Sequence, residues 1–585
     1  MTIYKVPLQE LQFILEHSVN YSELCQMPSF EYASEEMVAA ILPEAAKFFE
    51  QVVAPTNWPS NTQPAYLQNN QVITSPALDG VYQQMVEAGW CSLSGATEYG
   101  GAGFPVVIDA VVQEMLQSAN VGFSLLPTLT RGVIHALNLY GSDQQKDRYL
   151  EKLISGAWSG TMNLTEPQAG SDLSAVKTKA IPNGDHYLLS GQKIYITWGD
   201  HEQAENIIHL VLARLPDAPE GNQGISLFLV PKYLINEDGS LGERNDVKAV
   251  GVEHKLGIHS SPTCTLAFGD KGGAVGYLVG PLNQGLMCMF SMMNHARLAV
   301  GHQGVSVGER AYQQALDYAN QRVQGAVSGL EGKAPIIHHA DVKRMLMQMR
   351  ALNEAGRAMS LATMAAEDRA THHPQSEVKT ENALRVEVMT PLVKGWCTEM
   401  AMEVTSLGVQ VHGGMGFIEE TGAAQHMRDA RILPIYEGTN GIQALDFIGR
   451  KCLRDQGEGI RQLLADMSQT IETNKAELSK SLIAALEVTL GQCQSALDHV
   501  LAHPQKASFV AYQFMMLFGN SVAYWQLAIL GCAAAEKIQS GDQDEFLKQK
   551  LATAQFYKTQ ILPRNQSHLE AILVDSEFID NLKLN

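Results

Sequence analysis

Residues 184–200 read GDHYLLSGQKIYITWGD, and this stretch differs in texture from most of the chain around it. It is rich in β-branched and aromatic residues and is bounded by Gly and Asp, as strands and their turns are. The same texture recurs in NIIHLVLARL (206–215), GISLFLVPKYL (224–234) and SPTCTLAFGD (261–270). The residues from about Trp158 to Leu278 are therefore predicted to form a block of short strands, a small β-barrel or sandwich.

Both flanks of this block are predicted to be helical. Segments such as EEMVAAILPEAAKFFEQVV (35–53) place apolar residues at steps of three and four, as an amphipathic helix does. After Leu286 the helical segments are long and the links short, which predicts an antiparallel bundle. The predicted fold is mostly α-helical with an inserted β-barrel domain. Its predicted domains are an N-terminal arm (1–34), a helical domain (35–157), a β domain (158–281), a helical bundle (282–452) and a C-terminal helical extension (453–585).

Composition limits the classes of function. The 585-residue chain carries a formal net charge of −20 and has a pI near 5.4. A nucleic-acid-binding protein needs a basic face, and no Lys- or Arg-rich block is present. The eight cysteines are scattered and none form a CxxC pair, which predicts reduced thiols in a cytosolic protein rather than disulfides or a zinc site. The N-terminal residues show no secretion signal.

One uncharged segment, ASFVAYQFMMLFGNSVAYWQLAILGCAAA (507–535), is long enough to span a bilayer. Four polar residues interrupt it, and Gly519 is expected to split it. We therefore expect one or two buried helices of a bundle, with peripheral membrane contact as the alternative.

Three further segments could approach a ligand closely. In MNLTEPQAGSD (162–172), Gly170 and Ser171 leave backbone N–H groups open to an oxygen ligand; the alternative is a turn capped by Ser171 and Asp172. In YIT (195–197), aromatic and β-branched side chains could flank a planar ring, or simply complete a core strand. In QVHGGMG (410–416), the glycines mark the end of a helix or the approach of a cofactor.

A fourth segment, LPIYEGTNGIQ (433–443), holds a single carboxylate in a turn. Taken alone, Glu437 is most simply a solvated loop residue. The alternative is a catalytic acid–base group, because a carboxylate held in an apolar site gains a pKa suited to proton transfer. The pair His338 and His339 has no second ligand cluster placed by spacing, so we assign no metal site.

Taken together and in order, these segments resemble the acyl-CoA dehydrogenase family of flavoproteins. LTEPQAGSD, YIT, QVHGGMGF and YEGTNGIQ resemble its signatures, and HKLGIHSSPTCTLAF resembles the loop and strand that close its β domain. This resemblance covers roughly residues 35–450. The segment YKVPLQELQFILE (4–16) and the helices after Lys451 resemble an enlarged subgroup with an N-terminal arm and a C-terminal extension. That subgroup includes bacterial long-chain fatty acyl-CoA dehydrogenases and 3-methylmercaptopropionyl-CoA dehydrogenases.

The resemblance implies one FAD per subunit and a set of residues that would bind it. Carried over by motif, the cofactor-binding residues would be Met162, Leu164, Thr165, Gly170, Ser171, Tyr195, Ile196, Thr197, Arg322, Gln410, Gly413, Gly414, Thr439 and Asn440. The adenosine diphosphate half would be met by Arg322, Gln410, Gly413 and Gly414, partly from a neighbouring subunit. The residues along the acyl-CoA would be Ser171, Asn294, Arg297 and Gly438. Tyr195 departs from the family's usual Trp, and Ala296, Gln324 and Ala340 depart from its usual Glu, Phe and Gln.

The resemblance also implies the reaction. Glu437 would abstract the α-proton of an acyl-CoA, and the flavin N5 would accept the β-hydride, which yields a trans-2-enoyl-CoA. The expected substrates are medium- to long-chain fatty acyl-CoAs of β-oxidation, with 3-methylmercaptopropionyl-CoA as the alternative. The Met-rich stretch 287–293 would line the acyl pocket, or form plain bundle core.

The implied partners are an acyl-CoA, electron-transferring flavoprotein as electron acceptor, and a second copy of the chain in a homodimer. The expected location is the cytoplasm, with possible contact to the inner membrane. Two other functions are kept open: an acyl-CoA oxidase that uses oxygen, and a catalytically silent scaffold.

Overall fold

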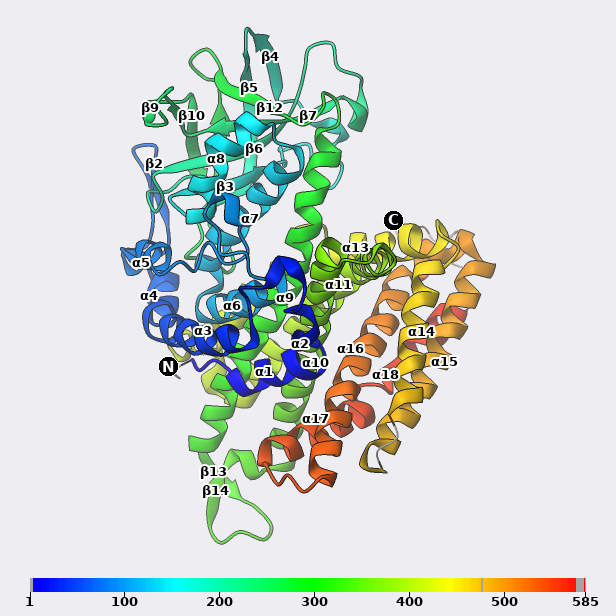
Figure 1. The fold of residues 1–585 in the computed structure, drawn as a ribbon. Helices are drawn as coiled ribbons and strands as arrows, with labels where there is room; N and C mark the ends of the chain where they lie inside the picture. Colours follow the sequence, from blue (N-terminus) through cyan, green and yellow to red (C-terminus); the bar gives the residue numbers. More distant parts are fainter. Residues whose placement is uncertain (1–3, 475–476, 575–582, 584–585) are drawn as a thin grey trace. The chain divides into compact units, whose positions relative to one another are not determined.

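The computed structural model of the chain describes residues 4–474, 477–574 and 583 (Figure 1). The chain divides into two compact units. The barrel unit comprises Glu44–Phe104 and Met115–Ala296, and the bundle unit comprises the described parts of Met1–Pro43, Pro105–Glu114 and Arg297–Asn585. The boundary falls inside three helices: α3 (Glu35–Phe48), α6 (Val106–Ala119) and α9 (Gly285–Gln321).

The barrel unit contains an eight-stranded sheet that closes on itself. Strand β5 pairs with β12, β12 with β7, β7 with β6, and β6 with β4, which returns to β5. Strands β3, β10 and β11 extend this ring. The bounds are β3 (Trp158–Asn163), β4 (Lys179–Asn183), β5 (His186–Thr197), β6 (Asn206–Arg214), β7 (Ile225–Pro231), β10 (Val247–Val252), β11 (Thr263–Phe268) and β12 (Ala274–Val279). The predicted β-barrel domain within a mostly helical chain is confirmed.

The sequences of strands β6 and β7 are mostly apolar because both strands are buried. Successive side chains of a strand point to opposite faces, and here both faces are buried. Leu210 and Leu227 pack into one hydrophobic cluster, whereas their neighbours Val211 and Phe228 pack into another. Neither face of these strands therefore selects polar residues.

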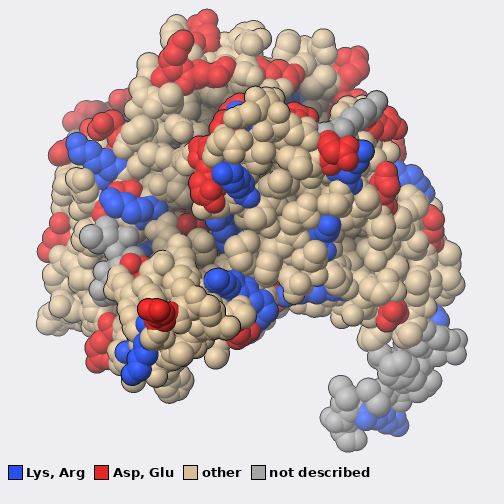
Figure 2. Space-filling model, turned by 90° about the horizontal axis from the view of Figure 1, so that it is seen from below, with Lys and Arg blue, Asp and Glu red and all other residues tan. Residues whose placement is uncertain are grey.

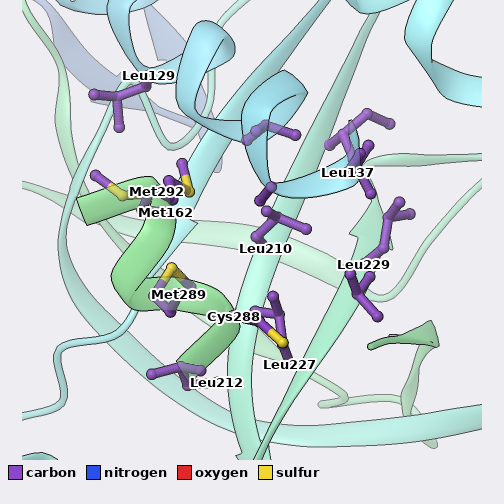
Figure 3. Packing of buried hydrophobic residues seen from close by; sticks show 14 of the residues in the cluster. Leu129, Leu137, Met162, Leu210, Leu212, Leu227, Leu229, Cys288, Met289 and Met292 are labelled. Atoms are coloured by element: carbon purple, nitrogen blue, oxygen red, sulfur yellow. The ribbon is translucent and has the colours of Figure 1, made fainter. Parts of the chain in front are cut away.

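The first of these clusters joins the outside of the barrel to helices (Figure 3). Helix α7 (Val121–Tyr140) contributes Leu129 and Leu137, and the start of α9 contributes Met289 and Met292. Gly160 of β3 permits this packing, because a Cβ there would lie 2.5 Å from the side chain of Val133. Met289 and Met292 are thus core residues between a helix and the barrel, while Met287 is half exposed.

The barrel unit also holds α4 (Asn57–Thr62), α5 (Val81–Glu87), α8 (Asp143–Ser155), the hairpin β1 (Tyr66–Gln68)–β2 (Gln71–Ile73) and the hairpin β8 (Tyr233–Ile235)–β9 (Leu241–Arg244). The first hairpin lies in a region predicted to be helical, and that prediction is wrong there. Its turn residues Asn69 and Asn70 both adopt a positive φ, at 51° and 60°. Two such residues are typical of a tight hairpin turn.

The bundle unit is built on the long helices α9, α10 (Ala340–His372) and α11 (Ser376–His412). The hairpin β13 (Val323–Ala326)–β14 (Lys333–Pro335) lies between α9 and α10. The unit's other helices are α1 (Leu8–His17), α2 (Tyr21–Leu24), α12 (Ala423–Ala430), α13 (Asn440–Ile448), α14 (Glu458–Thr473), α15 (Lys480–Ala502), α16 (Ala507–Gln539), α17 (Glu545–Gln560) and α18 (Arg564–Leu573).

The uncharged segment forms one unbroken helix, α16, at the centre of the C-terminal helices. It contacts α10, α11, α13, α15, α17 and α18. Gly519 does not split it: a Cβ there would lie 2.5 Å from Trp396 of α11, so the glycine admits that indole. Asn520 then accepts a hydrogen bond from Trp396 Nε1 at 2.7 Å. By length and composition α16 could cross a membrane, but 89% of its apolar window is buried inside the fold.

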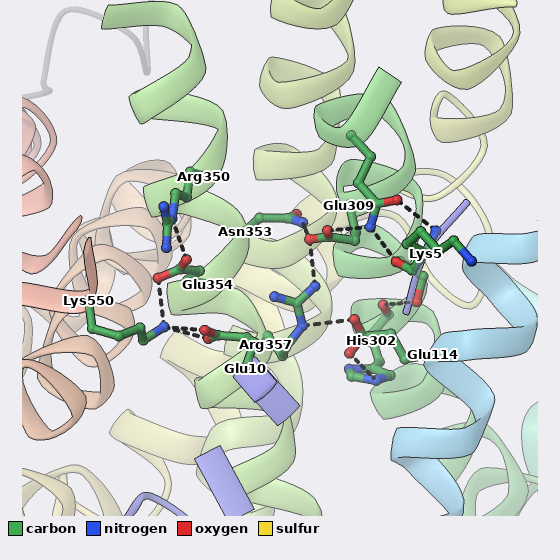
Figure 4. Close-up of polar contacts among 12 residues, drawn as sticks. Lys5, Glu10, Glu114, His302, Glu309, Arg350, Asn353, Glu354, Arg357 and Lys550 are labelled. Atoms are coloured by element: carbon green, nitrogen blue, oxygen red, sulfur yellow. Dashed lines mark hydrogen bonds and ion pairs between the residues drawn. The ribbon is translucent and has the colours of Figure 1, made fainter. Parts of the chain in front are cut away.

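A buried network of charged side chains lies in the bundle unit (Figure 4). Lys550 of α17 contacts Glu10 of α1 at 2.5 Å and Glu354 of α10 at 2.7 Å. Arg357 of α10 contacts Glu114 of α6 and Glu309 of α9, at 2.8 and 2.7 Å. The network therefore ties the N-terminal arm and the C-terminal extension to the bundle through paired charges, which burial requires.

On the face drawn in Figure 2, the described Lys and Arg side chains lie singly or in small groups among Asp and Glu side chains. All eight cysteines are free, and six of them are buried.

Candidate active site

The turn that carries Glu437 lies between α12 and α13 in the bundle unit. Glu437 has φ 55° and Gly438 has φ 85°. The left-handed region is costly for a residue with a Cβ, by about 1–3 kcal/mol, and such strain often persists at functional sites. Asn440 N–H donates to the carbonyl of Pro434 at 3.0 Å and closes the turn. Thr439 caps α13, because its Oγ1 accepts from Ile442 N at 3.3 Å.

Three side chains from three helices hold the two carbonyls of this turn. Lys394 Nζ of α11 donates to the Gly438 carbonyl at 2.8 Å. Arg297 Nε of α9 donates to the Glu437 carbonyl at 3.3 Å. Gln443 Nε2 of α13 donates to both carbonyls, at 3.3 and 3.2 Å. These contacts keep the strained backbone in one conformation.

The carboxylate of Glu437 is left without a direct partner. Within the part of the chain that the structure describes, no hydrogen bond or ion pair reaches this carboxylate, and no group accepts a hydrogen bond from the backbone N–H of Glu437. The residue keeps some accessible surface. Desolvation raises the pKa of Glu437 to about 6, and the positive charges of Arg297 and Lys394 limit this rise. A carboxyl group of this kind is suited to taking a proton near neutral pH.

Lys394 is a site residue that the sequence did not reveal. It is fully buried and also donates to Asn440 Oδ1 at 2.9 Å. Asn440 in turn donates to Thr398 Oγ1 at 2.9 Å and to Glu399 Oε1 at 2.8 Å. The amide of Asn440, predicted to bind cofactor, is thus engaged with α11. The signal in the sequence was a lone Lys in the helical run PLVKGWCTEM (391–400), which pattern alone does not separate from a surface Lys.

Arg297 and Asn294, predicted to contact substrate, differ in surroundings. Arg297 is buried, and its guanidinium lies 3.6 Å from the carboxylate of Asp446 in α13. Asn294, one turn earlier on α9, is exposed. In the bundle unit, Arg297, Glu437, Gly438, Thr439 and Asn440 are therefore brought together.

In the barrel unit, the predicted segments 162–171 and 195–197 also come together. Ile194 N donates to the Thr165 carbonyl at 2.9 Å, and Lys193 Nζ donates to the Leu164 carbonyl at 2.9 Å. Met162 is buried in β3, while Leu164 and Thr165 are partly exposed and Gly170 and Ser171 are exposed.

Glu166 fixes the loop that carries these residues. Its carboxylate accepts from Lys193 Nζ at 2.8 Å, from Thr178 Oγ1 at 2.6 Å and from Lys177 N at 2.7 Å. Burial alone would raise the pKa of Glu166, but the Lys193 charge and these hydrogen bonds lower it to about 2. Glu166 is therefore ionised and structural.

The end of β5 presents an aromatic side chain. Tyr195 has φ 60° and is 60% exposed, whereas Ile196 beside it is buried and Thr197 is partly exposed. Trp198, the next residue, is fully buried and its Nε1 donates to the Gly122 carbonyl at 3.0 Å. Anchored by its buried neighbours, Tyr195 projects an exposed ring at a fixed place on the strand.

The remaining predicted cofactor residues lie in the bundle unit. Arg322, immediately after α9, and Gln410, on the last turn of α11, are both exposed. α11 ends at His412, and Gly413 follows with φ 59°. A Cβ on Gly413 or Gly414 would meet nothing within 4 Å, so open space surrounds both glycines.

Four family models match the chain. They are the N-terminal domain (residues 34–157), middle domain (161–270) and C-terminal domain (283–453) of acyl-CoA dehydrogenase, and a region described as acetyl-CoA dehydrogenase C-terminal like (463–579).

Relatives and a solved structure match over nearly the whole chain. The chain is 47% identical to 3-methylmercaptopropionyl-CoA dehydrogenase of Ruegeria pomeroyi, over 96% of each chain. It is 35% identical to the broad-specificity linear acyl-CoA dehydrogenase FadE5 of Mycobacterium tuberculosis, over 85% of this chain and 84% of that protein. The crystal structure of an acyl-CoA dehydrogenase complexed with FAD from Bacillus anthracis has a TM-score of 0.69 and 22% identity, and covers 99% of this chain and 91% of that chain.

Proposed function

Because the chain belongs to the acyl-CoA dehydrogenase family, we propose that it catalyses FAD-dependent α,β-dehydrogenation of an acyl-CoA with Glu437 as the catalytic base. Acyl-CoA dehydrogenases are oxidoreductases that bind FAD. The assignment of the base rests on the surroundings of the Glu437 carboxylate. It is desolvated, has a pKa near 6 and has no bonding partner among the described residues.

The residues present fit FAD. In the barrel unit, Tyr195 offers an exposed ring for a planar group, and the exposed Gly170 leaves its backbone accessible. In the bundle unit, the exposed Arg322 supplies positive charge and the open space at Gly413 and Gly414 suits a diphosphate. We propose that these residues, with Met162, Leu164, Thr165, Ser171, Ile196, Thr197, Gln410, Thr439 and Asn440, bind the cofactor. When bound, FAD supplies the acceptor for the two electrons that leave with the hydrogen on Cβ.

The chain's own groups handle the proton at Cα. Glu437 takes this proton, and the electron pair of the broken Cα–H bond forms the new double bond of a trans-2-enoyl-CoA. We propose that the backbone N–H of Glu437, which has no acceptor among the described residues, donates to the thioester carbonyl and so stabilises negative charge as it develops. Gly438 adopts the positive φ of 85° that the turn requires, and the bond from Lys394 Nζ to its carbonyl keeps the turn from relaxing. Ser171, Asn294 and Arg297 complete the proposed acyl-CoA contacts.

For the substrate we propose 3-methylmercaptopropionyl-CoA. The supporting observation is the similarity to the Ruegeria pomeroyi enzyme, which spans both the N-terminal arm and the C-terminal extension. Medium- to long-chain fatty acyl-CoAs are the second candidate, supported by the similarity to a broad-specificity linear acyl-CoA dehydrogenase. The buried state of Met289 and Met292 does not distinguish the two candidates.

The test is a substrate panel with the purified, FAD-containing enzyme. Bleaching of the flavin absorbance is followed anaerobically with 3-methylmercaptopropionyl-CoA and with linear acyl-CoAs from short to long chains. The highest kcat/KM is expected for the thioether substrate. Preference for a long linear chain would replace the proposed substrate, and absence of bleaching with every acyl-CoA would favour a catalytically silent scaffold.

For the electron acceptor we propose electron-transferring flavoprotein. Reduced enzyme is expected to reoxidise rapidly with this protein and slowly with oxygen. Rapid oxygen uptake on addition of acyl-CoA would instead identify an acyl-CoA oxidase.

We propose a homodimer located in the cytoplasm, with peripheral contact to the inner membrane as the alternative location. An exposed apolar patch supports self-association: Met415, Phe417 and Ile418 are 47%, 87% and 46% exposed. Sedimentation equilibrium should give twice the mass of the chain. Flotation with lipid vesicles tests the membrane contact.

A further inference from the structure

A buried lysine lies beneath the strained turn of the site. Lys394 belongs to α11, is fully buried, and reaches the Gly438 carbonyl and the Asn440 amide oxygen at 2.8 and 2.9 Å. A buried ammonium group is unfavourable unless it is paired or hydrogen-bonded, and an apolar side chain of similar length would fill the same space at lower cost. Its presence therefore calls for an explanation beyond packing.

The hydrogen bonds of Lys394 act on backbone conformation. Glu437 and Gly438 both adopt a positive φ, and Lys394 donates the shortest of the four hydrogen bonds that reach their carbonyls. Through Asn440 it also holds the first residue of α13. A displacement of the Gly438 carbonyl would rotate the peptide between Gly438 and Thr439 and so shift the turn that carries the Glu437 carboxylate.

The charge of Lys394 acts on the carboxylate itself. Burial lowers the pKa of Lys394 to about 7, while the charges of Glu437 and Glu399 oppose that change and Arg297 adds to it. Reciprocally, Arg297 and Lys394 are the two positive groups that limit the rise in the pKa of Glu437. Arg297 is itself shared with Asp446 of α13, whereas the other contacts of Lys394 are to neutral oxygens.

We propose that Lys394 is a positioning residue for the proton-abstraction step: its ammonium group fixes the turn that aims the Glu437 carboxylate and supplies a positive charge that keeps this carboxylate ionised. This inference rests on the proposed role of Glu437 as the base. Lys394 touches the turn and not the reacting atoms.

The groups that face this pair come from three helices and the turn. They are Arg297 on α9, Glu399 on α11, Asp446 on α13 and Tyr436 beside Glu437, whose pKa burial and the Glu437 charge both raise. Arg450 is paired with Asp446 and lowers the pKa of Arg297. Of these groups, only Lys394 and Arg297 favour the ionised state of Glu437.

The test compares wild type with K394M, K394R and T398V. In K394M the positive charge is lost, so the pKa of Glu437 rises and the acid limb of the kcat–pH profile moves upward by about 1 in pH. At pH 6 this gives a fall in kcat of about fivefold, with FAD content and KM near wild type. K394R keeps the charge and should keep the acid limb in place. T398V removes the hydroxyl that also contacts Asn440 but changes no charge, so it should lower the melting temperature without moving the limb.

A readout without turnover accompanies the kinetics. The infrared band of the protonated Glu437 carboxyl group, taken as the difference between each protein and its E437Q counterpart, is titrated over pH. Its midpoint should lie higher in K394M than in wild type.

Each outcome decides the inference. A folded, FAD-containing K394M with an unmoved acid limb and infrared midpoint overturns it. If K394M does not fold, K394Q keeps an N–H donor without the charge and replaces it. If neither neutral variant folds with FAD, Lys394 serves folding and the proposal is overturned. Failure of the proposed function is separate: wild-type flavin would then not bleach with any acyl-CoA.

Discussion

Two glutamates of the predicted signatures, Glu166 and Glu437, carry the same functional group in opposite surroundings. The Glu166 carboxylate accepts hydrogen bonds from Lys193, Thr178 and Lys177, and its pKa falls to about 2. The Glu437 carboxylate has no hydrogen bond or ion pair among the described residues, and desolvation raises its pKa to about 6.

The difference teaches what separates a structural acid from an available one. A carboxylate surrounded by donors is held in its charged form and cannot exchange a proton near neutral pH. A desolvated carboxylate without donors has both the pKa and the free lone pairs that proton transfer needs. In the charge network of Figure 4, Glu10, Glu354 and Glu309 each contact a cation, as Glu166 does.

The largest effect is expected from E437Q. The amide cannot take a proton, so turnover should fall about 10³-fold or more, while the fold and the FAD content stay unchanged. Steady-state kcat and flavin absorbance per protein measure the two quantities. A kcat near that of wild type in E437Q would contradict the assignment of Glu437 as the base, and with it the contrast to Glu166 as the structural acid.

E166Q should show the reverse pattern. Loss of its charge leaves the Lys193 ammonium buried without a carboxylate, which destabilises a protein by about 3–5 kcal/mol. Thermal unfolding should register this loss, and FAD content should fall with it. The double variant E166L/K193M, which removes both charges, serves as the control and should recover part of the stability. An unchanged melting temperature in E166Q would show that the pair is not structural.

Glu437 and Glu166 should affect different properties of the protein in different ranges of pH. For wild type, kcat should be half-maximal near pH 6, because Glu437 must be unprotonated to act. Well below pH 6, kcat should fall about tenfold for each unit by which the pH decreases. The pKa of Glu166 is depressed by folding, so its stabilising contribution is present above its ordinary pKa of 4.5 and is lost as pH falls through about 2.

Two profiles check this separation. The difference in melting temperature between wild type and E166Q should stay constant from about pH 8 to 5 and narrow below about 4.5. A kcat profile that is flat down to pH 5 would contradict the assignment of Glu437.

The smallest effect is expected at Thr439, next to the proposed base. Its hydroxyl caps α13, so T439A should lose about 1 kcal/mol of stability, and T439S, which keeps the hydroxyl, should lose less. Denaturant unfolding measures the loss. A drop in FAD affinity in T439A, restored in T439S, would support the predicted cofactor contact of Thr439.

Much of the fold followed from the sequence because the patterns are local. Runs of β-branched and aromatic residues predicted the strands β5, β6 and β7. Helical periodicity of the apolar residues predicted the helices α9 to α11. The hairpins β1–β2 and β13–β14 were missed because they are short and mostly exposed, so burial imposed no pattern on them. Gly519 was misread as a helix breaker because its reason is tertiary: Trp396 occupies the space where its side chain would be.

The roles of the site residues also depend on tertiary contacts that the sequence does not show. Glu437 could be proposed from the turn around it, but nothing in the linear sequence shows that its carboxylate has no donors. Lys394 is 43 residues earlier and looks like any helical lysine, and its role depends on the packing of α11 against the turn before α13. Glu166 lies in a motif that suggested cofactor contact, while its ion pair with Lys193 depends on the approach of the loop to β5.

The central claim is that Glu437 removes the α-proton, and hydrogen exchange at Cα tests it most directly. The enzyme is loaded with FAD, the FAD is chemically reduced so that it accepts no hydride, and an acyl-CoA is incubated with it in D₂O. Deuterium that enters Cα then reports proton removal alone. The account predicts rapid incorporation by wild type that is half-maximal near pH 6, and incorporation at the rate without enzyme by E437Q. Incorporation by E437Q at the wild-type rate would contradict it.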